Sequence, residues 1–126
     1  MRVVLDSSAL IAFVEREPGG EVVARHLAQS ALSSVNYSET IARLVAKGTP
    51  VDRAARIVEV LDLDIVDFDA KQALETAAML PRTKDRGLSL GDRACLTLGL
   101  KLNLSVLTAD RAWAGLLLGV KIDLIR

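Results

Sequence analysis

Short apolar runs alternate with longer helical stretches along the chain, and this alternation constrains the fold more than any other feature. The run RVVL at residues 2–5 is typical of a strand that is buried on both faces. Strands separated by helices throughout predict an α/β fold with a mostly parallel sheet and right-handed crossovers. Further strands are predicted at residues 32–34, 65–68, 104–107 and, with the alternation of an edge strand, 120–124.

The helices are predicted from apolar periodicity and from the residues that begin and end them. The segment 36–47 carries a clear apolar stripe, and Thr49-Pro50 begins the next helix, so residues 36–62 form a helical hairpin with an apolar side. The helix at 91–102 is apolar almost all round and is expected to be deeply buried. Pro81 is expected to end a helix and to begin a polar, basic loop over 81–90. The other predicted helices cover residues 7–15, 20–30, 69–80 and 110–118.

The composition indicates a globular protein with an aliphatic core. At 126 residues the chain has the size of one domain, and we expect 1–126 to form a single domain. Hydrophobic residues make up 51% of the chain, which excludes a disordered protein, and aromatic residues only 3%. No apolar run is long enough to span a bilayer and no signal-peptide cleavage pattern is present, so we expect a cytoplasmic protein without membrane contact.

The cysteine and histidine content excludes several kinds of catalytic site. Cys95 is the single cysteine, and its apolar helical surroundings indicate a buried, inert thiol. His26 is the single histidine and is interpreted as a structural or surface residue. A zinc site and the usual Cys–His or Ser–His machinery are therefore not expected.

Four acidic residues lie where a predicted strand gives way to a helix, or on the first turn of a helix. They are Asp6, Glu39, Asp92 and Asp110. Because the carboxyl ends of parallel strands share one edge of a sheet, these carboxylates are expected to converge. Gathered carboxylates repel one another unless a cation holds them, and hard cations such as Mg²⁺ prefer oxygen ligands.

Helix capping is the ordinary alternative explanation for each of these residues. Asn36-x-x-Glu39 and Ser89-x-x-Asp92 both match the capping-box pattern, and an acidic residue at a helix start also favours the helix dipole. This explanation weakens for the set, because other residues are available as caps: Asn36, Ser89, Thr108 and Ser7 or Ser8. A metal-dependent phosphoryl-transfer site is therefore the leading interpretation. One or two Mg²⁺ or Mn²⁺ ions would activate water and stabilise charge on a phosphodiester, without a side-chain nucleophile.

The net charge neither requires nor excludes a nucleic-acid substrate. The chain has 16 basic and 16 acidic residues, which argues against a generic nucleic-acid binder. If four carboxylates belong to a metal site, the rest of the chain has 16 basic and 12 acidic residues, a net charge of +4. That balance is compatible with RNA.

Four segments of the chain resemble the motifs of the PIN domain, in particular those of VapC-type toxin ribonucleases of bacterial and archaeal toxin–antitoxin pairs. They are DSSAL at 6–10, SSVNYSE ending in Glu39, LGDRACLTLG around Asp92 and SVLTADRAW around Asp110. The segments occur in the right order and span nearly the whole chain. The resemblance implies a PIN-like, Rossmann-like three-layer fold with about five mostly parallel strands and about seven helices.

The resemblance also implies roles for individual residues and partners. The acidic residues that would coordinate Mg²⁺ or Mn²⁺ and carry catalysis are Asp6, Glu39, Asp92 and Asp110. The hydroxyls of Ser8 and Thr108 would support them. The family further implies RNA as substrate, a homodimer, and a cognate small antitoxin that blocks the site.

Basic residues near these motifs are further candidates for substrate binding. Arg82, Lys84 and Arg86 are possible contacts for RNA phosphates, with a solvated loop as the alternative. Arg43 lies one turn after Glu39 and is expected to form an i,i+4 ion pair with it. Trp113 is expected to pack in the protein, with base stacking as a less favoured role.

Three other functions compete with a toxin ribonuclease. A PIN nuclease of RNA maturation has the same site, and an inert PIN-like module would use the 36–62 hairpin for interactions. A receiver-like phosphoacceptor has an acidic pair beside its first strand and a lysine after a late strand, and both features are absent here.

Overall fold

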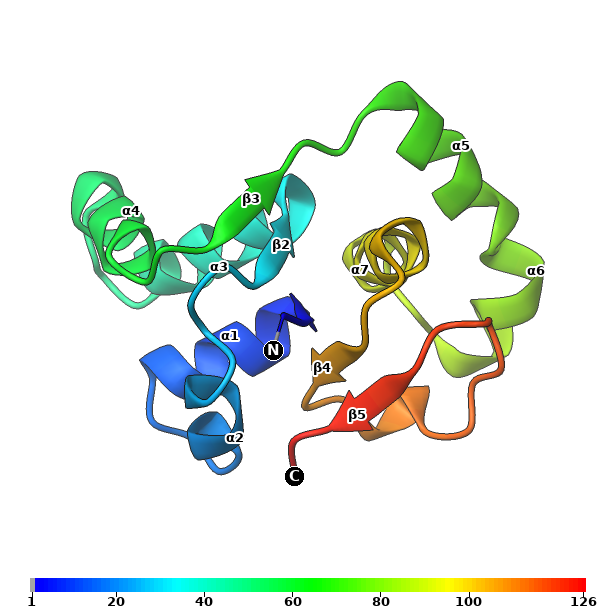
Figure 1. The fold of residues 1–126 in the computed structure, drawn as a ribbon. Helices are drawn as coiled ribbons and strands as arrows, with labels where there is room; N and C mark the ends of the chain where they lie inside the picture. The colour runs from blue at the N-terminus through cyan, green and yellow to red at the C-terminus, as the bar shows by residue number, and fades with distance from the viewer. Residues whose placement is uncertain (1) are drawn as a thin grey trace.

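The sheet of the protein is parallel throughout and places the first strand at its centre (Figure 1). In the computed structural model, which describes residues 2–126, the strand order is β3-β2-β1-β4-β5. The strands are β1 (Val4–Leu5), β2 (Ala31–Ser33), β3 (Asp64–Val66), β4 (Val106–Thr108) and β5 (Ile122–Leu124). The predicted edge position of the last strand is confirmed, and the carboxyl ends of all five strands lie at one edge of the sheet.

Seven α-helices lie within the described residues 2–126, and they cover the two faces of the sheet in separate groups (Figure 1). The helices α1 to α4 pack on one face, and α5 to α7 lie on the other. Their bounds are α1 (Ser7–Val14), α2 (Gly20–Ala24), α3 (Ser34–Ala46), α4 (Val51–Glu59), α5 (Ala70–Ala78), α6 (Leu80–Thr83) and α7 (Leu90–Leu102). Two short 3₁₀-helices complete the set, η1 (Lys84–Arg86) and η2 (Arg111–Trp113). The expected three-layer α/β fold is confirmed.

Alternate residues of the central strand enter two separate hydrophobic cores. Val3 and Leu5 join the core under α1 and α2, whereas Val4 joins the core under α7. This division follows from the period of two in a strand, which sends successive side chains to opposite faces. The middle of α7, residues 94–99, is buried against the second core as its apolar sequence predicted, whereas Leu90 and Leu100 near its ends are exposed. Cys95 is fully buried in that core, so the prediction of a buried thiol is confirmed, and burial raises its pKa well above the usual value, as expected for an unreactive thiol.

Two predicted elements around residues 81–90 and 110–118 are wrong. Pro81 does not begin a loop but occupies the first turn of α6, where a missing N–H and a fixed φ cost nothing. The predicted helix over 110–118 is only the single turn η2, because Ala114 is extended and Gly115 has a φ of +79°. Trp113 and Leu118 are buried in the second core. The apolar residues of this segment therefore anchor an irregular chain to the core and do not mark one face of a helix.

The predicted helix over 20–30 is also too long, since α2 ends at Ala24. The chain continues in turns to Gln29, whose φ of +65° cannot belong to an α-helix. None of the helices that the structure describes combines the length and the apolar character that crossing a bilayer requires.

We predict that Gly99→Ala destabilises the protein by about 1–3 kcal/mol, although alanine is the better helix former. A Cβ at this position of α7 would lie 2.6 Å from Val106 Cγ2 and 2.9 Å from Val120 Cγ2, so the helix would have to move away from β4. Urea unfolding measures the change, with Ser38→Ala on the exposed side of α3 as control. A stability equal to that of the wild type would contradict the tight packing of α7.

Candidate metal centre

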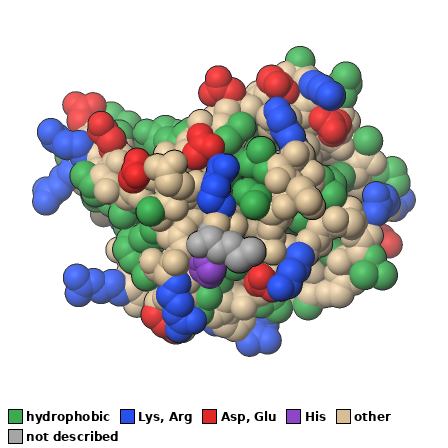
Figure 2. All heavy atoms as spheres, in the orientation of Figure 1, with side chains coloured by type: hydrophobic (Ala, Val, Ile, Leu, Met, Phe, Trp, Pro, Cys, Tyr) green, Lys and Arg blue, Asp and Glu red, His purple; other side chains and the backbone are tan. Residues whose placement is uncertain are grey.

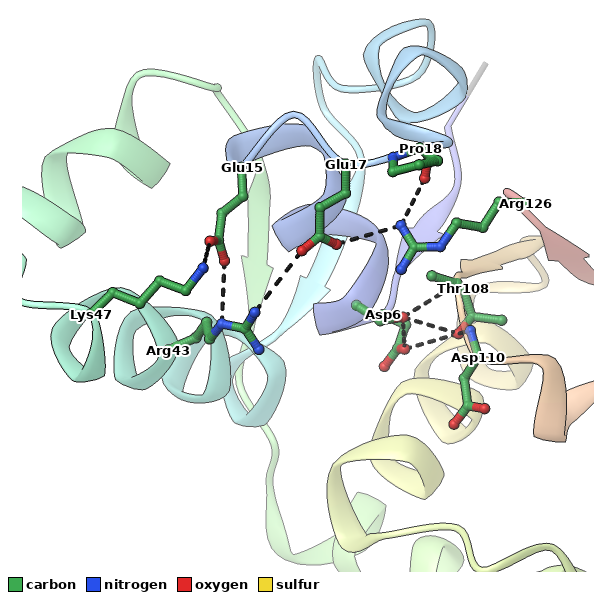
Figure 3. Close-up of polar contacts among 11 residues, drawn as sticks. Asp6, Glu15, Glu17, Pro18, Arg43, Lys47, Thr108, Asp110 and Arg126 are labelled. Carbon is green, nitrogen blue, oxygen red and sulfur yellow. Dashed lines mark hydrogen bonds and ion pairs between the residues drawn. The ribbon is translucent and has the colours of Figure 1, made fainter.

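Asp6 is the most buried of the four candidate carboxylates and occupies the end of the central strand. Its side chain is 2% exposed, and its backbone N–H donates to Leu107 O of β4 at 3.0 Å. The carboxylate oxygen Oδ2 accepts from Ser8 Oγ at 2.6 Å and from Thr108 Oγ1 at 2.9 Å (Figure 3). The residue is the N-cap of α1, but its side chain makes no capping hydrogen bond. Capping therefore does not explain this carboxylate.

The second oxygen of Asp6 has no partner although it is buried. Oδ1 makes no hydrogen bond to any other described residue. Burial raises the pKa of Asp6 from 3.8 to about 6, the hydrogen bonds from Ser8 and Thr108 oppose this shift, and the charges of Asp92 and Glu39 add to it. A buried, unpaired carboxylate oxygen among other carboxylates is costly for the fold and indicates a place for a positively charged ligand.

Glu39 is held in place by Asn36 and by the absence of a side chain at Gly91. Asn36 Nδ2 donates to Glu39 Oε1 at 2.9 Å and to Gly91 O of α7 at 3.0 Å. A Cβ built on Gly91 would lie 2.1 Å from Glu39 Oε2, so only glycine leaves room for this carboxylate. The predicted capping box of Asn36 and Glu39 is wrong, because Ser33 caps α3 and Asn36 lies inside the helix.

Asp92 has the capping role that its sequence pattern predicted. Its backbone N–H donates to Ser89 Oγ at 3.2 Å, and its Oδ2 accepts from the Ser89 N–H at 2.9 Å, which completes a capping box at the start of α7. Partial burial raises the pKa of Asp92, the bonds from Ser89 lower it, and the charges of Asp110 and Glu39 raise it further. The capping box uses only one of the two carboxylate oxygens.

Asp110 is tied to Asp6 through the hydroxyl of Thr108. Its N–H donates to Thr108 Oγ1 at 3.1 Å, and the same hydroxyl donates to Asp6 Oδ2 (Figure 3). Its Oδ1 accepts from the N–H of Ala112 at 2.9 Å, so Asp110 is the N-cap of η2. Thr108, suggested as a possible cap, is instead the buried last residue of β4 and links two of the four carboxylates.

The supporting hydroxyls form one connected network between β1 and β4. Ser8 Oγ lies 3.2 Å from Thr108 Oγ1 and accepts from the N–H of Ala109 at 3.0 Å. The two predicted hydroxyl residues are therefore in contact with each other and with Asp6. Their geometry holds the carboxylate of Asp6 in one orientation, with Oδ1 left free.

The four carboxylates act on one another electrostatically but do not meet at a point. The charges of Asp92 and Glu39 raise the pKa of Asp6, and the charges of Asp110 and Glu39 raise the pKa of Asp92. Among residues 2–126, no three His, Cys, Asp or Glu side chains lie close enough together to hold a metal ion as they stand. The donor set fits a hard divalent cation, because it is made of carboxylate oxygens and includes the unpaired Oδ1 of Asp6. Mutual repulsion is a sufficient reason for such side chains to stay apart when no cation lies between them.

The candidate RNA-binding arginines have structural partners. Arg82 Nη2 donates to Leu117 O at 2.9 Å, and Arg86 Nη1 donates to Ala112 O at 3.1 Å and also to Ala114 O. These bonds hold the irregular segment after η2 against α6 and η1. Lys84 is exposed on η1. RNA contact by Arg82, Lys84 and Arg86 stays a prediction, although two of the three already serve the fold.

Two further sequence expectations are resolved by the packing. Arg43 does not pair with Glu39 but lies 3.3 Å from Glu15 Oε1 and 3.9 Å from Glu17 Oε2, and both glutamates lie in the segment that follows α1 (Figure 3). Trp113 is 0% exposed, which confirms packing and excludes stacking on an RNA base.

Comparison with known proteins identifies the family. The PIN domain model matches residues 3–116, and the chain belongs to the PIN domain family. A search among curated proteins found no match.

Solved structures show the same fold at low sequence identity. A chain of a toxin–antitoxin complex from Klebsiella pneumoniae superposes with a TM-score of 0.77 at 17% identity, covering 98% of each chain. A chain of a DNA-bound VapBC complex from Salmonella typhimurium gives 0.74 at 19% identity, covering 100% of this chain and 99% of the other. VapC20 of Mycobacterium tuberculosis, described as a Sarcin-Ricin loop cleaving toxin, gives 0.72 at 16% identity, covering 93% and 97%.

Two residues of the centre were missed as functional positions in the sequence. The sequence indicates Asn36 only as a cap, and Gly91 only as the first residue of the helix predicted over 91–102. The available signal was a glycine directly before Asp92 inside a helical pattern, since such a glycine commonly has a packing reason. Its partner, a carboxylate 52 positions earlier, is visible only in the structure.

We predict that the stability of the metal-free protein falls as pH rises from about 4 to about 6. The pKa of Asp6 is 3.8 in its ordinary state and about 6 in the fold, so over this range the folded protein keeps a proton that the unfolded chain has released. Asp6→Asn removes this dependence and should be more stable than the wild type at neutral pH by on the order of 2 kcal/mol. Thermal unfolding with a chelator measures this, with the exposed Asp52→Asn as charge-matched control. A pH profile identical in wild type and Asp6→Asn would contradict the burial argument.

We further predict that Gly91→Ala weakens Mn²⁺ binding roughly 10- to 100-fold, because the new Cβ displaces the Glu39 carboxylate. Calorimetric Mn²⁺ titration of the folded variant measures this, beside Ser38→Ala. Unchanged Mn²⁺ affinity in a folded Gly91→Ala protein would show that Glu39 is not a ligand of the metal.

Proposed function

We propose that this protein is a metal-dependent endoribonuclease and the toxin of a toxin–antitoxin pair, which hydrolyses RNA phosphodiester bonds. The observation that carries the proposal is the buried Asp6 at the end of the central strand, with its unpaired Oδ1 within electrostatic reach of Glu39 and Asp92. The PIN family match and the toxins among the structural neighbours support the toxin assignment.

The residues that would hold Mg²⁺ or Mn²⁺ are Asp6, Glu39, Asp92 and Asp110. Such an ion, when bound, would lower the pKa of a water molecule and offset charge on the phosphodiester. Asp6 contributes the oxygen without a protein partner, and Asp92 contributes the oxygen that its capping box leaves unused. An inert module would have little reason to keep a buried carboxylate oxygen unpaired.

The protein's own part in the reaction is to orient these groups before substrate arrives. Ser8 and Thr108 hold Asp6 from one side, and Asn36 holds Glu39 from another segment of the chain. These partners come from α1, β4 and α3, which are packed against each other through the core. Catalytic groups fixed in this way need little reorganisation when charge develops on the substrate.

We propose a surface of α3 and α4 as the place where protein partners dock. A cavity of about 430 Å³ lies between these helices, and Val45 and Val51 at its edge are 44% and 58% exposed. This is the hairpin whose apolar side the sequence indicated, and it would serve a cognate small antitoxin. We also propose a homodimer, from the apolar helix faces at 36–62 together with the analogy to the PIN family, and a cytoplasmic location.

We predict that Asp6→Asn and Asp92→Asn each reduce metal-dependent RNA cleavage at least about 100-fold while the proteins stay folded. Both replacements keep an oxygen acceptor for Ser8 and Ser89 and remove only the charge. Cleavage of total RNA with Mg²⁺ or Mn²⁺ is measured for the purified variants, with circular dichroism as the folding check and Asp52→Asn as control. Wild-type cleavage by both variants, or cleavage that persists with a chelator, would overturn the assignment.

A further inference from the structure

A second pocket lies beside the candidate metal centre and is lined by cationic side chains. Its volume is about 380 Å³, and its walls are formed by Ser7, Ser8, Ile11, Glu17, Arg43 and Arg126. Ser7, Ser8 and Ile11 belong to α1, and Glu17 lies in the connection between α1 and α2. Arg43 belongs to α3, and Arg126 follows β5. The pocket therefore forms only in the folded protein.

Ser8 connects the pocket to the metal centre. It lines the pocket, and its hydroxyl donates to Asp6 Oδ2 at 2.6 Å. Figure 3 shows Arg43 and Arg126 reaching Glu17 from opposite sides, with Asp6 and Thr108 drawn below Glu17. An RNA strand bound across the metal centre would therefore pass directly beside this pocket.

The charge of the pocket is positive. Arg126 Nη1 lies 3.4 Å from Glu17 Oε1, and Arg43 Nη2 lies 3.9 Å from Glu17 Oε2. Glu15 pairs with Arg43 and with Lys47 at the outer end of the same group. Three cations thus face two carboxylates in this group of five residues.

Both arginines keep hydrogen-bond donors that are free to bind a ligand. Arg126 uses only Nη1, which also donates to Pro18 O at 2.7 Å, and its side chain is 36% exposed. Arg43 is 45% exposed, and its contacts with Glu15 and Glu17 are long for hydrogen bonds. A guanidinium has five donors in a fork that matches phosphate, and partly exposed ion pairs of this kind are individually weak.

An RNA substrate needs cations close to this centre. Four carboxylates repel a phosphodiester backbone, and on the face seen in Figure 2 basic and acidic side chains are interspersed and form no field of one sign. The basic segment formed by α6 and η1 is a poorer source of cations, because Arg82 and Arg86 donate to backbone carbonyls. Arg43 and Arg126, in contrast, line the pocket that Ser8 connects to Asp6.

We propose that this pocket binds a phosphate of the RNA strand adjacent to the bond that is cleaved, through Arg43 and Arg126. The N–H groups of Ser7 and Ser8 at the start of α1 assist, since both residues line the pocket and the Asp6 side chain does not cap the helix. Glu17 holds the two guanidinium groups and competes with the phosphate for them. The inference rests on the proposed ribonuclease function, because it assigns a subsite to that reaction.

Binding without cleavage tests the subsite separately from the nuclease assignment. A fluorescein-labelled single-stranded RNA of mixed sequence is titrated at several salt concentrations with a chelator present. Arg43→Gln and Arg126→Gln should each weaken binding roughly threefold to tenfold and reduce the salt slope by about 0.7. Glu17→Gln should tighten binding, because a competing charge is removed. Arg53→Gln, an exposed arginine of α4 outside the pocket, is the matched control and should match the wild type.

Steady-state cleavage with Mn²⁺ provides the second readout. The two arginine variants should raise KM and leave kcat near the wild-type value, because the phosphate they bind is not the one that reacts. The subsite would be overturned if Arg43→Gln, Arg126→Gln and the control Arg53→Gln all lost RNA affinity to the same extent. Weaker RNA binding by Glu17→Gln would overturn it too. If both arginine variants cleaved RNA with the wild-type kcat and KM, the subsite would also be overturned, but the ribonuclease assignment would stand. Absence of cleavage by the wild type, with the RNA-binding pattern as expected, would instead overturn the ribonuclease assignment.

Discussion

The buried carboxylate of Asp6 is the constraint on which the site depends. It stands at the end of the central strand, where burial makes its charge costly and raises its pKa to about 6. Two hydroxyls hold one of its oxygens, and one of them belongs to the neighbouring strand β4. The other oxygen is left without a partner. A fold that retains such a group gives up stability at the place where a cation is proposed to bind.

The rest of the centre is built by packing around this carboxylate. Helix α7 is buried along most of its length, so its first turn and Asp92 are placed rigidly at the carboxyl edge of the sheet. Gly91 lets the side chain of Glu39 lie against that turn, and Asn36 bonds both Glu39 and the backbone of α7. The carboxylates are therefore oriented by residues that carry no charge themselves.

The zero net charge of the chain conceals a local separation of charge. Asp6 at the end of the central strand acts electrostatically with Glu39 and Asp92, and Asp92 does so with Asp110, whereas Arg43 and Arg126 lie in the adjoining pocket. Local potentials of opposite sign at neighbouring sites can orient a polyanion that the protein as a whole would not attract. Composition alone is thus a poor guide to whether such a protein binds RNA.

The sequence by itself determined the α/β class, the five strands and the position of Asp6, Asp92 and Asp110 at strand ends or helix starts. These features depend on local periodicity and on neighbours a few residues apart, as the Ser89 and Asp92 capping box shows. The expected place of Glu39 on a first turn is wrong, because α3 begins at Ser34 and puts Glu39 in its second turn. Tertiary structure alone decided that Asn36 bonds Glu39, that Arg43 pairs with Glu15, and that residues 110–118 anchor in a core without forming a helix. Each of these outcomes joins segments that are distant along the chain or depends on a backbone angle that packing imposes, and such contacts leave no periodic signal in the sequence.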